Sequence, residues 1–572
     1  GMAVRPSMTK RGGKNKVVIT NPKKSIAEYN ARFAAQTLDV ETGFEVGYAY
    51  RGSISSSHGK DTRLLFTTDG YLVAHSRDDP LFSDYSVIMI DEAHERTVYI
   101  DTLLFMLRRA VLARPHDLRV VIMSATIDPA LFTEYFRRES VPTALVEVSG
   151  VTNKPVESVF VPPDTASDAD YLKGPGMKAL AAALTRTAPG ENVLFFVPTA
   201  RDAEKGCKET ANACRSGRLP GSCSSLLCST LYAKMPEERQ MEARSQDVAP
   251  PNDRKIIFAT NIAESSLTLA SLIVVIDSGL ELESVWLPEY HCQRMQRVMS
   301  TQAQMLQRKG RVGRTKPGVC YHLYTEEAMR KRPLYPDPSI VTVDLTDDIL
   351  TMTKTEKSLY AACADFAHFI TPPTVAQVVS AVSVLTFHRA VVVHVANAAQ
   401  TSEKKDGPIR GSHFWDARFP RLVDELQDLH AVRQTFSAHG GGHVTPLGDV
   451  VLEAMRRCKL GFWNSLLMVG ALLFSGDDDA TELEDVATLA SVLEETGGDH
   501  SLLWYDDARA PEVIKKIGTK LHPTSEHLSI LTLYAELNGS RRHTYVQDGI
   551  VSDGMLNKIA RRVQDMMSGI QA

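Results

Sequence analysis

Residues 88–97 read I-M-I-D-E-A-H-E-R-T, an apolar run that ends abruptly in Asp91 and Glu92. An apolar strand followed by two acids is typical of a nucleotide-hydrolysing site. An Asp at a strand end suits a Mg²⁺ ion, and the next Glu can polarise a water for attack on a phosphorus. The alternative is a helix with favourable acids in its first turn. The histidine and arginine that follow favour the first interpretation.

Short β-branched apolar runs alternate with helical stretches from residue 17 to about residue 280. Such runs predict parallel strands buried on both faces, and therefore an α/β fold with enough strands for two sheets. The break between the sheets is expected within 150–174, and the chain after about 335 reads as helical. The predicted strands are Val17–Thr20, Leu64–Thr68, Val87–Ile90, Val120–Met123, Val156–Val161, Val193–Val197, Lys255–Thr260 and Leu272–Asp277.

Composition restricts the class of protein. A chain of 572 residues is too long for one core, so several domains are expected. The net charge of −5 means that any nucleic-acid surface must be a local basic groove. No uninterrupted apolar stretch is long enough for a membrane span. The basic N-terminus is compatible with a targeting segment, so we expect an intracellular protein of the nucleus, cytoplasm or mitochondrion.

The eight cysteines include no C-x-x-C pair. This pattern predicts reduced thiols and no disulfide framework. Four cysteines lie between Cys207 and Cys228, but their spacing favours a thiol-bearing surface insertion over a zinc site.

Three further segments carry polar groups at predicted strand ends or in basic loops. The strand at 120–123 leads into Ser124 and Thr126, which can relay a hydrogen bond or cap a helix. Residues 258–268 gather hydroxyls and Asn261, which suit either a nucleic-acid backbone or a helix start. Residues 307–314 read Q-R-K-G-R-V-G-R, whose arginines suit a transferring phosphoryl group or a phosphate backbone.

Taken together and in order, these segments resemble a DEAH-box RNA helicase of superfamily 2. The resemblance covers nearly the whole chain and is most specific from 17 to 330. The segments that resemble the family's motifs Ia, Ib, II, III, IV, V and VI are Thr20–Lys24, Thr68–Leu72, Asp91–His94, Ser124–Thr126, Phe196–Thr199, Ala259–Ser266 and Gln307–Arg314. Looser matches continue at Val444–Gly448, His527–Tyr534 and Met555–Ile570.

The resemblance implies a domain order: a RecA-like domain at 1–150, a second at 151–330, a winged-helix domain at 331–400 and a helical ratchet domain at 401–572. It further implies that 285–302 forms a strand-separating β-hairpin. ATP or another NTP, with Mg²⁺, is the implied cofactor. RNA and ribonucleoprotein components are the implied partners, and no membrane is expected.

The resemblance also implies residue roles. Asp91 would hold Mg²⁺, Glu92 would orient the attacking water, and His94 would couple to Gln307. Arg311 and Arg314 would act as arginine fingers. Arg32, Ser124 and Thr126 would serve the nucleotide site. The residues expected to contact RNA backbone, with little sequence preference, are Lys23, Lys24, Thr68, Asp69, Thr260 and Asn261.

One departure from the family pattern bears on activity. The family's G-x-G-K-T loop stands upstream of motif Ia, and the printed sequence starts too late to include it; 12–16, G-G-K-N-K, runs straight into a strand and is no substitute. The chain as printed is therefore expected to hydrolyse ATP poorly. Leu280 also stands where an aromatic usually contacts adenine, and the family's C-terminal oligonucleotide-binding fold is not in the printed sequence.

Two interpretations stay open. The first is an ATP-dependent RNA helicase whose phosphate loop lies outside this sequence. The second is a catalytically inactive RNA-binding or assembly protein on a helicase body. A DNA helicase is a third, minor possibility, because the motifs do not separate RNA from DNA rigorously.

Overall fold

The computed structural model divides into two compact units, which are described separately. The first comprises Gly1–Val151, Ser284–Arg294 and Tyr335–Val444, and the second comprises Thr152–Glu283, Met295–Leu334 and Thr445–Ala572. The residues described are 16–50, 58–59, 61–124, 128–147, 154–162, 171–220, 225–232, 235, 237–245, 252–266, 271–392, 442–474, 480–496, 503, 510–518, 521–522 and 524–571.

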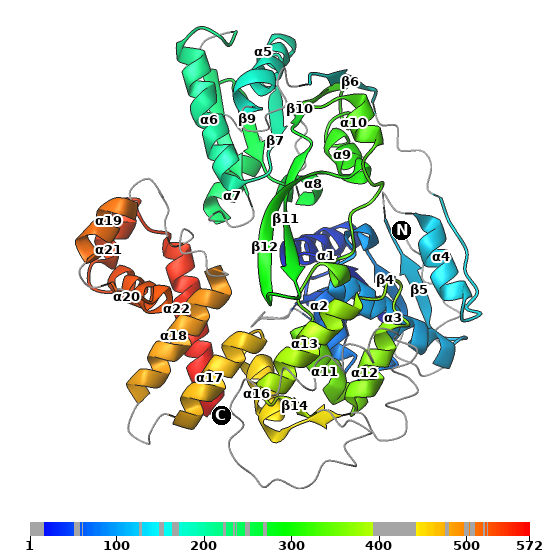
Figure 1. The fold of residues 1–572 in the computed structure, drawn as a ribbon. Helices are drawn as coiled ribbons and strands as arrows, with labels where there is room; N and C mark the ends of the chain where they lie inside the picture. The colour runs from blue at the N-terminus through cyan, green and yellow to red at the C-terminus, as the bar shows by residue number, and fades with distance from the viewer. Residues whose placement is uncertain are drawn as a thin grey trace. The chain divides into compact units, whose positions relative to one another are not determined.

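The first unit is built on a five-stranded parallel sheet in the order β2-β3-β1-β4-β5 (Figure 1). Its strands are β1 (Lys16–Asn21), β2 (Val46–Ala49), β3 (Leu64–Thr68), β4 (Tyr85–Ile90) and β5 (Arg119–Ile122). The connecting helical elements are α1 (Lys24–Leu38), α2 (Asp69–His75), the 3₁₀ turn η2 (Ala93–Glu95), α3 (Val98–Ala113) and α4 (Pro129–Arg137). All four predicted strands of this part are confirmed to within two residues, whereas β2 was not predicted.

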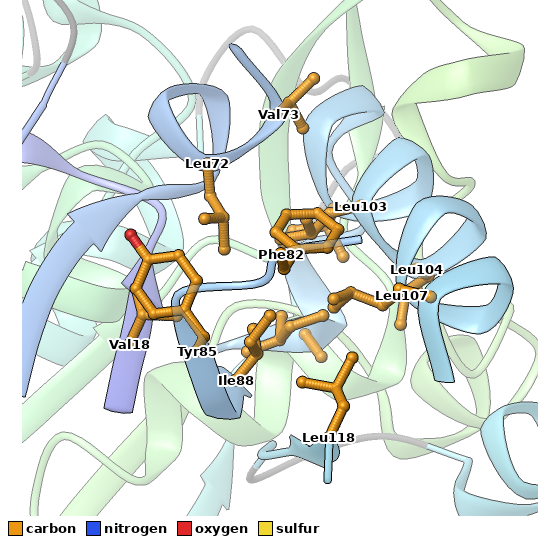
Figure 2. Close-up of a cluster of buried hydrophobic side chains, with 14 of the residues drawn as sticks. Val18, Leu72, Val73, Phe82, Tyr85, Ile88, Leu103, Leu104, Leu107 and Leu118 are labelled. Atoms are coloured by element: carbon orange, nitrogen blue, oxygen red, sulfur yellow. The ribbon is translucent and has the colours of Figure 1, made fainter. Parts of the chain in front are cut away.

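A continuous apolar core lies between the sheet and its helices. Helix α3 begins at Thr97, whose hydroxyl accepts a hydrogen bond from the Ile100 N–H. Its residues 100–105, 107, 108 and 110 are all buried, so the helix is covered on more than one side, and it packs against α2 and β5. Figure 2 shows the resulting cluster, which includes Val18, Leu72, Val73, Phe82, Tyr85, Ile88, Leu103, Leu104, Leu107 and Leu118.

Helices from later in the chain complete the first unit. They are the 3₁₀ turn η6 (Ser339–Val341), α11 (Thr346–Glu356), α12 (Leu359–Phe366) and α13 (Val375–Phe387), with a two-stranded antiparallel pair β14 (Val391–Val392) and β15 (His443–Val444). Phe369 stacks on Phe105 of α3 with ring centroids 4.9 Å apart. The segment beginning at 335 is therefore helical, as predicted, while 393–441 lies outside the described residues.

The second unit holds a six-stranded parallel sheet in the order β6-β13-β10-β7-β9-β8. Its strands are β6 (Val156–Phe160), β7 (Asn192–Phe196), β8 (Leu226–Leu231), β9 (Arg254–Ala259), β10 (Leu272–Asp277) and β13 (Gly318–His322). The helical elements are η4 (Leu172–Gly176), α5 (Met177–Arg186), α6 (Ala200–Arg215), α7 (Glu237–Arg244), α8 (Ile262–Ser266), α9 (Gln302–Lys309) and α10 (Glu326–Arg330). The prediction of two parallel sheets is confirmed, although β8 and β13 were not predicted.

The hairpin expected at 285–302 is present as β11 (Leu280–Leu287) and β12 (Cys292–Met299). It begins earlier than predicted, because Gly279 turns the chain directly out of β10. Gly279 has a φ of +69°, and a Cβ there would lie 2.4 Å from the Tyr324 ring.

The chain ends in helices, as predicted. They are α16 (Pro446–Cys458), α17 (Phe462–Phe474), α18 (Ala480–Thr496), α19 (Ala510–Ile517), α20 (Glu526–Asn538), α21 (Arg542–Gln547) and α22 (Asp553–Gln571). Thr445 caps α16 by accepting from the Gly448 N–H. Residues of α18, α20 and α22 share one apolar core with Leu503 and Tyr545.

The prediction of reduced cysteines is wrong for one group. Cys207 on α6 and Cys228 on β8 form a disulfide, and Cys214 is also disulfide-bonded. Helix α6 packs on β8 and brings the two Cα atoms within 5.7 Å, a separation that a disulfide can bridge but that sequence spacing does not reveal. Cys292, Cys320, Cys363 and Cys458 are free thiols.

Within the described part of the chain, no helix combines the length and the apolar character that crossing a membrane requires.

Candidate nucleotide and RNA site

The D-E-A-H segment leaves the carboxyl end of β4, in the middle of the first sheet. The Asp91 N–H donates to the Thr20 carbonyl at 3.2 Å, and the Ala93 N–H donates to the Met123 carbonyl at 3.0 Å. Between them, Glu92 has a φ of 51°, in the left-handed region that non-glycine residues rarely adopt. Such a conformation persists only where the surroundings impose it, and it is common at functional sites.

Two donors orient the Asp91 carboxylate. Asn21 Nδ2 donates to Asp91 Oδ2 at 3.1 Å, and the Glu92 N–H donates to Asp91 Oδ1 at 3.0 Å. Burial raises the pKa of Asp91, and the charge of Glu92 raises it further. A fixed carboxylate at a strand end is a hard oxygen ligand, so the side chain fits the predicted Mg²⁺ site.

His94 lies between Glu92 and the end of the neighbouring strand. Its Nδ1 lies 3.0 Å from Ser124 Oγ and 3.4 Å from Glu92 Oε2. Burial lowers the pKa of His94, so the imidazole is neutral at pH 7. The structure therefore brings three predicted site residues together, while Thr126 lies outside the described residues.

A buried arginine fixes the chain just after this segment. Arg96 also has a positive φ, 42°, and its guanidinium forms a two-bonded pair with Asp101 at 2.7 and 2.9 Å. The same group donates to Thr371 Oγ1 at 2.7 Å. Charge-assisted paired bonds of this kind hold a loop rigidly. Arg96 therefore fixes the position of the chain directly after the D-E-A-H segment.

The predicted RNA contacts of the first unit lie at neighbouring strand ends. Lys23 stands at the start of α1, and the Lys24 ammonium lies 5.8 Å from the centre of the Tyr50 ring. Thr68 precedes α2 and is half-buried. The structure thus places Lys23, Lys24 and Thr68 at neighbouring strand ends of the first sheet.

The burial of Asp69 bears on its predicted RNA contact. Its side chain is only 3% exposed. Burial raises its pKa to about 6, and the Asp91 charge contributes. The RNA contact of Asp69 therefore stays a prediction, and the burial of its side chain does not favour it. Arg32, predicted to contact the nucleotide base, is exposed and bonded to Glu28 at 2.8 Å.

The arginine-rich segment of the second unit begins in the last turn of α9. Gln307 and Arg311 are half-buried, and Arg314 is exposed. Gly313 has a φ of +78°, and a Cβ there would lie 2.7 Å from the Lys154 carbonyl oxygen. Only glycine fits this turn, which sets where the chain carries Arg314.

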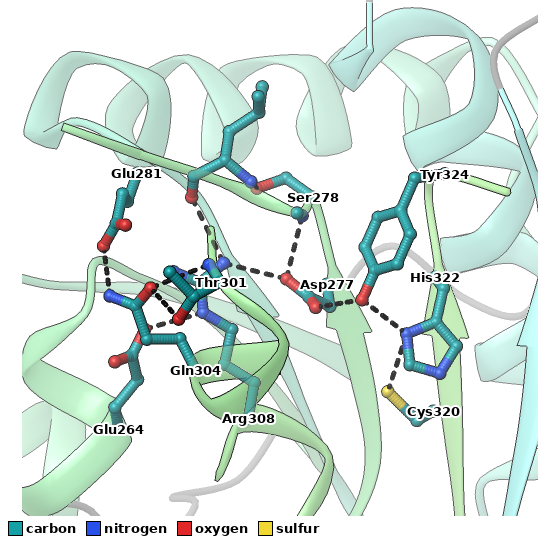
Figure 3. A network of polar contacts seen from close by, with 12 residues as sticks. Glu264, Asp277, Ser278, Glu281, Thr301, Gln304, Arg308, Cys320, His322 and Tyr324 are labelled. Carbon is teal, nitrogen blue, oxygen red and sulfur yellow. Dashed lines mark hydrogen bonds and ion pairs between the residues drawn. The ribbon is translucent and has the colours of Figure 1, made fainter. Parts of the chain in front are cut away.

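Arg308, which the sequence did not single out, is the buried centre of this segment. Its guanidinium donates to Glu264 Oε1 at 2.7 Å and to Asp277 Oδ1 at 2.9 Å, and its side chain is 1% exposed. Figure 3 shows these contacts. Asp277 also accepts from the Tyr324 hydroxyl at 2.7 Å. Arg308 therefore joins the segments that resemble motifs V and VI to the end of β10.

Thr260 and Asn261 follow β9 at the start of α8. The Thr260 N–H donates to the Leu231 carbonyl at 3.0 Å, and Thr260 is 9% exposed, whereas Asn261 is exposed. Asn261 is thus the better placed of the two for an RNA backbone contact.

Comparison with known proteins agrees with this geometry. Residues 2–132 match the model of the DEAD/DEAH box helicase family, and residues 176–316 match that of the helicase conserved C-terminal domain. A protein of Acanthamoeba polyphaga mimivirus assigned as an ATP-dependent RNA helicase is 38% identical over 340 residues, which cover 59% of this chain and 46% of that protein.

Two further proteins show the same relationship. The pre-mRNA-splicing factor ATP-dependent RNA helicase prp22 of Schizosaccharomyces pombe is 35% identical over 334 residues, covering 58% of this chain and 27% of that protein. The crystal structure of the Escherichia coli DEAH/RHA helicase HrpB shares the fold with a TM-score of 0.61 and 23% identity, covering 86% of this chain and 52% of that one. The chain thus spans less than half the length of the mimivirus protein and of prp22.

Two parallel sheets, with D-E-A-H after β4 in one and the arginine-rich segment after α9 in the other, carry the two matched domains. These comparisons identify a superfamily 2 helicase core of the DEAH-box type over residues 2–132 and 176–316.

Proposed function

We propose that this protein is an ATP-dependent RNA helicase that couples NTP hydrolysis to RNA translocation or to remodelling of RNA–protein complexes. The observation that carries the proposal is the Asp91–Glu92 pair, with Asp91 held by Asn21 and Glu92 in a left-handed conformation. A protein that only binds RNA has no need of a strained acid beside an oriented carboxylate.

Each side chain supports one part of the reaction. Asp91 presents a carboxylate already oriented by two donors, and Mg²⁺ bound there would offset phosphate charge. The Glu92 side chain is 34% exposed, so its carboxylate can reach a water and accept a hydrogen bond from it. His94 Nδ1 lies 3.4 Å from Glu92 Oε2, and burial lowers the pKa of His94, which disfavours a positive charge beside Glu92.

The second unit contributes arginines and a rigid support for them. Arg308 ties α9 to Glu264 and Asp277, so the turn that carries Arg311 and Arg314 starts from a fixed helix end. Guanidinium groups stabilise charge on a transferring phosphoryl group, which is the role proposed for Arg311 and Arg314.

RNA binding is proposed for Lys23, Lys24, Thr68 and Asn261. These residues offer ammonium, hydroxyl and amide groups, which contact phosphate and sugar and carry little sequence information. Affinity should therefore fall steeply with salt and vary little with RNA sequence.

The test uses the natural protein, whose intact mass is measured first to establish whether a G-K-T loop is present. Displacement of a labelled strand from an RNA duplex is then followed with ATP and Mg²⁺ for the wild type, Glu92→Gln and Glu95→Gln. Glu95→Gln is the matched control, because it makes the same chemical change three residues along. We expect displacement in the wild type and in Glu95→Gln, and none in Glu92→Gln. RNA binding without ATP-dependent displacement in any of the three would favour the inactive RNA-binding protein.

A further inference from the structure

Three neighbouring strands bring polar side chains to one edge of the first sheet, and the middle one of the three ends in the buried Asn21. Asn21 ends β1 and is fully buried, opposite Thr68 of β3 in the strand register. On its other side, Thr20 lies opposite Ile90, the last residue of β4, which is followed by Asp91. Asn21 is thus flanked by the two strand ends that carry the proposed RNA and metal residues.

Asn21 also joins these regions along the chain. Only Pro22 separates it from Lys23 and Lys24, the proposed RNA contacts. Its amide donates to Asp91 Oδ2 at 3.1 Å, and it is a side-chain donor to this carboxylate from outside the D-E-A-H segment. A shift of the Lys23–Lys24 turn would therefore move a donor bonded directly to Asp91.

The other end of the same amide is not satisfied. Asn21 Oδ1 is buried and has no hydrogen-bond partner among the residues that the structure describes. A buried unpaired acceptor costs on the order of 1–3 kcal/mol, so this arrangement is not the best that the side chain could adopt. The Asn21 amide is therefore held through Nδ2 alone, and a different side-chain orientation could give Oδ1 a hydrogen-bond partner.

We propose that Asn21 is a positioning residue that couples RNA bound at Lys23 and Lys24 to the orientation of the Asp91 carboxylate. The inference rests on the proposed function, because it assigns RNA to the lysines and the metal–nucleotide to Asp91. The inference adds Asn21 as the residue that links RNA binding at the lysines to nucleotide binding at Asp91. Coupling of this kind is reciprocal, so bound nucleotide must change RNA affinity by the same factor as bound RNA changes nucleotide affinity.

A binding measurement isolates this coupling from turnover. The natural protein is titrated with fluorescent single-stranded RNA, with and without Mg²⁺ and a non-hydrolysable ATP analogue, and the ratio of the two Kd values is the coupling factor. Asn21→Leu keeps the side-chain size and removes the donor. Thr67→Val is the matched control, because it removes a buried donor from the neighbouring strand, where Thr67 Oγ1 donates to the Ala49 carbonyl at 2.7 Å.

We expect a wild-type coupling factor of at least about fivefold, retained in Thr67→Val. In Asn21→Leu the factor should fall to about one, with the Kd for RNA alone within about twofold of the wild type. A merely structural Asn21 would lower thermal stability and leave the factor unchanged.

A factor retained in Asn21→Leu, or a factor of one in the wild type, overturns the inference. Failure of the proposed function is distinguishable, because it appears as absent ATP-dependent strand displacement and not as a change in this ratio. Asn21→Ser is a second variant for the case that Asn21→Leu is poorly folded. It keeps a shorter side-chain donor, so its coupling factor should lie between that of Asn21→Leu and that of the wild type.

Discussion

Arg308 Nη1 lies 2.9 Å from Asp277 Oδ1, and both side chains are excluded from solvent, at 1% and 0% exposure. The same guanidinium also pairs with Glu264, so one cation is shared by two buried acids from different segments. Removing one partner from such a group leaves uncompensated charge in the interior, which costs far more than losing a surface ion pair.

Arg308→Met should therefore destabilise the second unit by about 3–5 kcal/mol, because Glu264 and Asp277 lose their shared counter-ion. Arg186→Met is the control: its pair with Glu157 has the same kind of bond, at 2.7 Å, but the side chains are 46% and 56% exposed. That change should cost far less, because water screens an exposed ion pair and such pairs contribute little to stability. Urea unfolding followed by fluorescence measures both. Equal losses in the two variants would contradict the assignment of Arg308 as the buried centre of the network.

The stability of the second unit should depend on the ionisation of Glu281. Burial raises its pKa from 4.5 to about 7. Between those values the folded state holds a proton that the unfolded state releases, so the free energy of unfolding falls as pH rises. The fall is at most about 3 kcal/mol, at roughly 1.4 kcal/mol per pKa unit. Glu281→Gln should flatten the profile of thermal stability between pH 4.5 and pH 7. Glu283→Gln, two positions along the same strand, should change the slope only slightly, because the Glu283 charge is the smallest of the causes that raise the Glu281 pKa. An unchanged slope in Glu281→Gln is the contrary result.

Asp69→Asn tests whether Asp69, one of the predicted RNA contacts, takes part in RNA binding. Because Asp69 is 3% exposed, the change should leave RNA affinity within about twofold of the wild type. Lys24→Ala should weaken binding to all sequences and reduce the salt slope by about one. Fluorescence anisotropy at several salt concentrations measures both, with circular dichroism to confirm folding. A loss in Asp69→Asn equal to that in Lys24→Ala would support the predicted RNA contact of Asp69.

Gly313→Ala should destabilise the turn after α9. The new Cβ would meet the Lys154 carbonyl oxygen at 2.7 Å, and the φ of +78° adds a cost of about 1–3 kcal/mol. Gly310→Ala is the matched control in the same segment, because its nearest neighbours lie at an ordinary 3.4 Å. Differential scanning calorimetry should show a lower Tm in Gly313→Ala and little change in Gly310→Ala. A similar Tm in the two variants would show that the turn is less constrained than the structure indicates.

Long apolar strands were the most predictable part of the fold. β3 and β10 begin and end where the pattern of branched apolar residues predicts, because each is buried on both faces. β2 has only four residues, and β8 mixes Cys, Ser and Thr with leucine, so neither shows a clear apolar run. Their strand state depends on pairing with neighbours, which local sequence does not contain.

Within the site, residue type was predictable and burial was not. Asp91 and Glu92 could be chosen because two acids directly after a buried apolar strand are typical of a metal- and water-binding strand end. Arg308 looked like one more cation in a basic segment. Its acid partners lie 31 and 44 residues away in sequence, and only the fold brings them together. Asp69 shows the converse, since a polar residue beside proposed RNA contacts turned out to be buried.

The central claim is that Glu92 performs the hydrolytic step of an RNA-dependent motor. The most direct measurement is the single-turnover rate of ATP hydrolysis by the natural protein, with saturating RNA and Mg²⁺, for the wild type, Glu92→Gln and Glu95→Gln. General-base catalysis is worth about 10²–10⁴-fold, so Glu92→Gln should be slower than the wild type by at least about 10²-fold, with RNA affinity unchanged. Glu95→Gln changes a half-buried acid outside the Asp91–Glu92 pair and should remain within about threefold of the wild type. Equal rates in the wild type and Glu92→Gln would contradict the account.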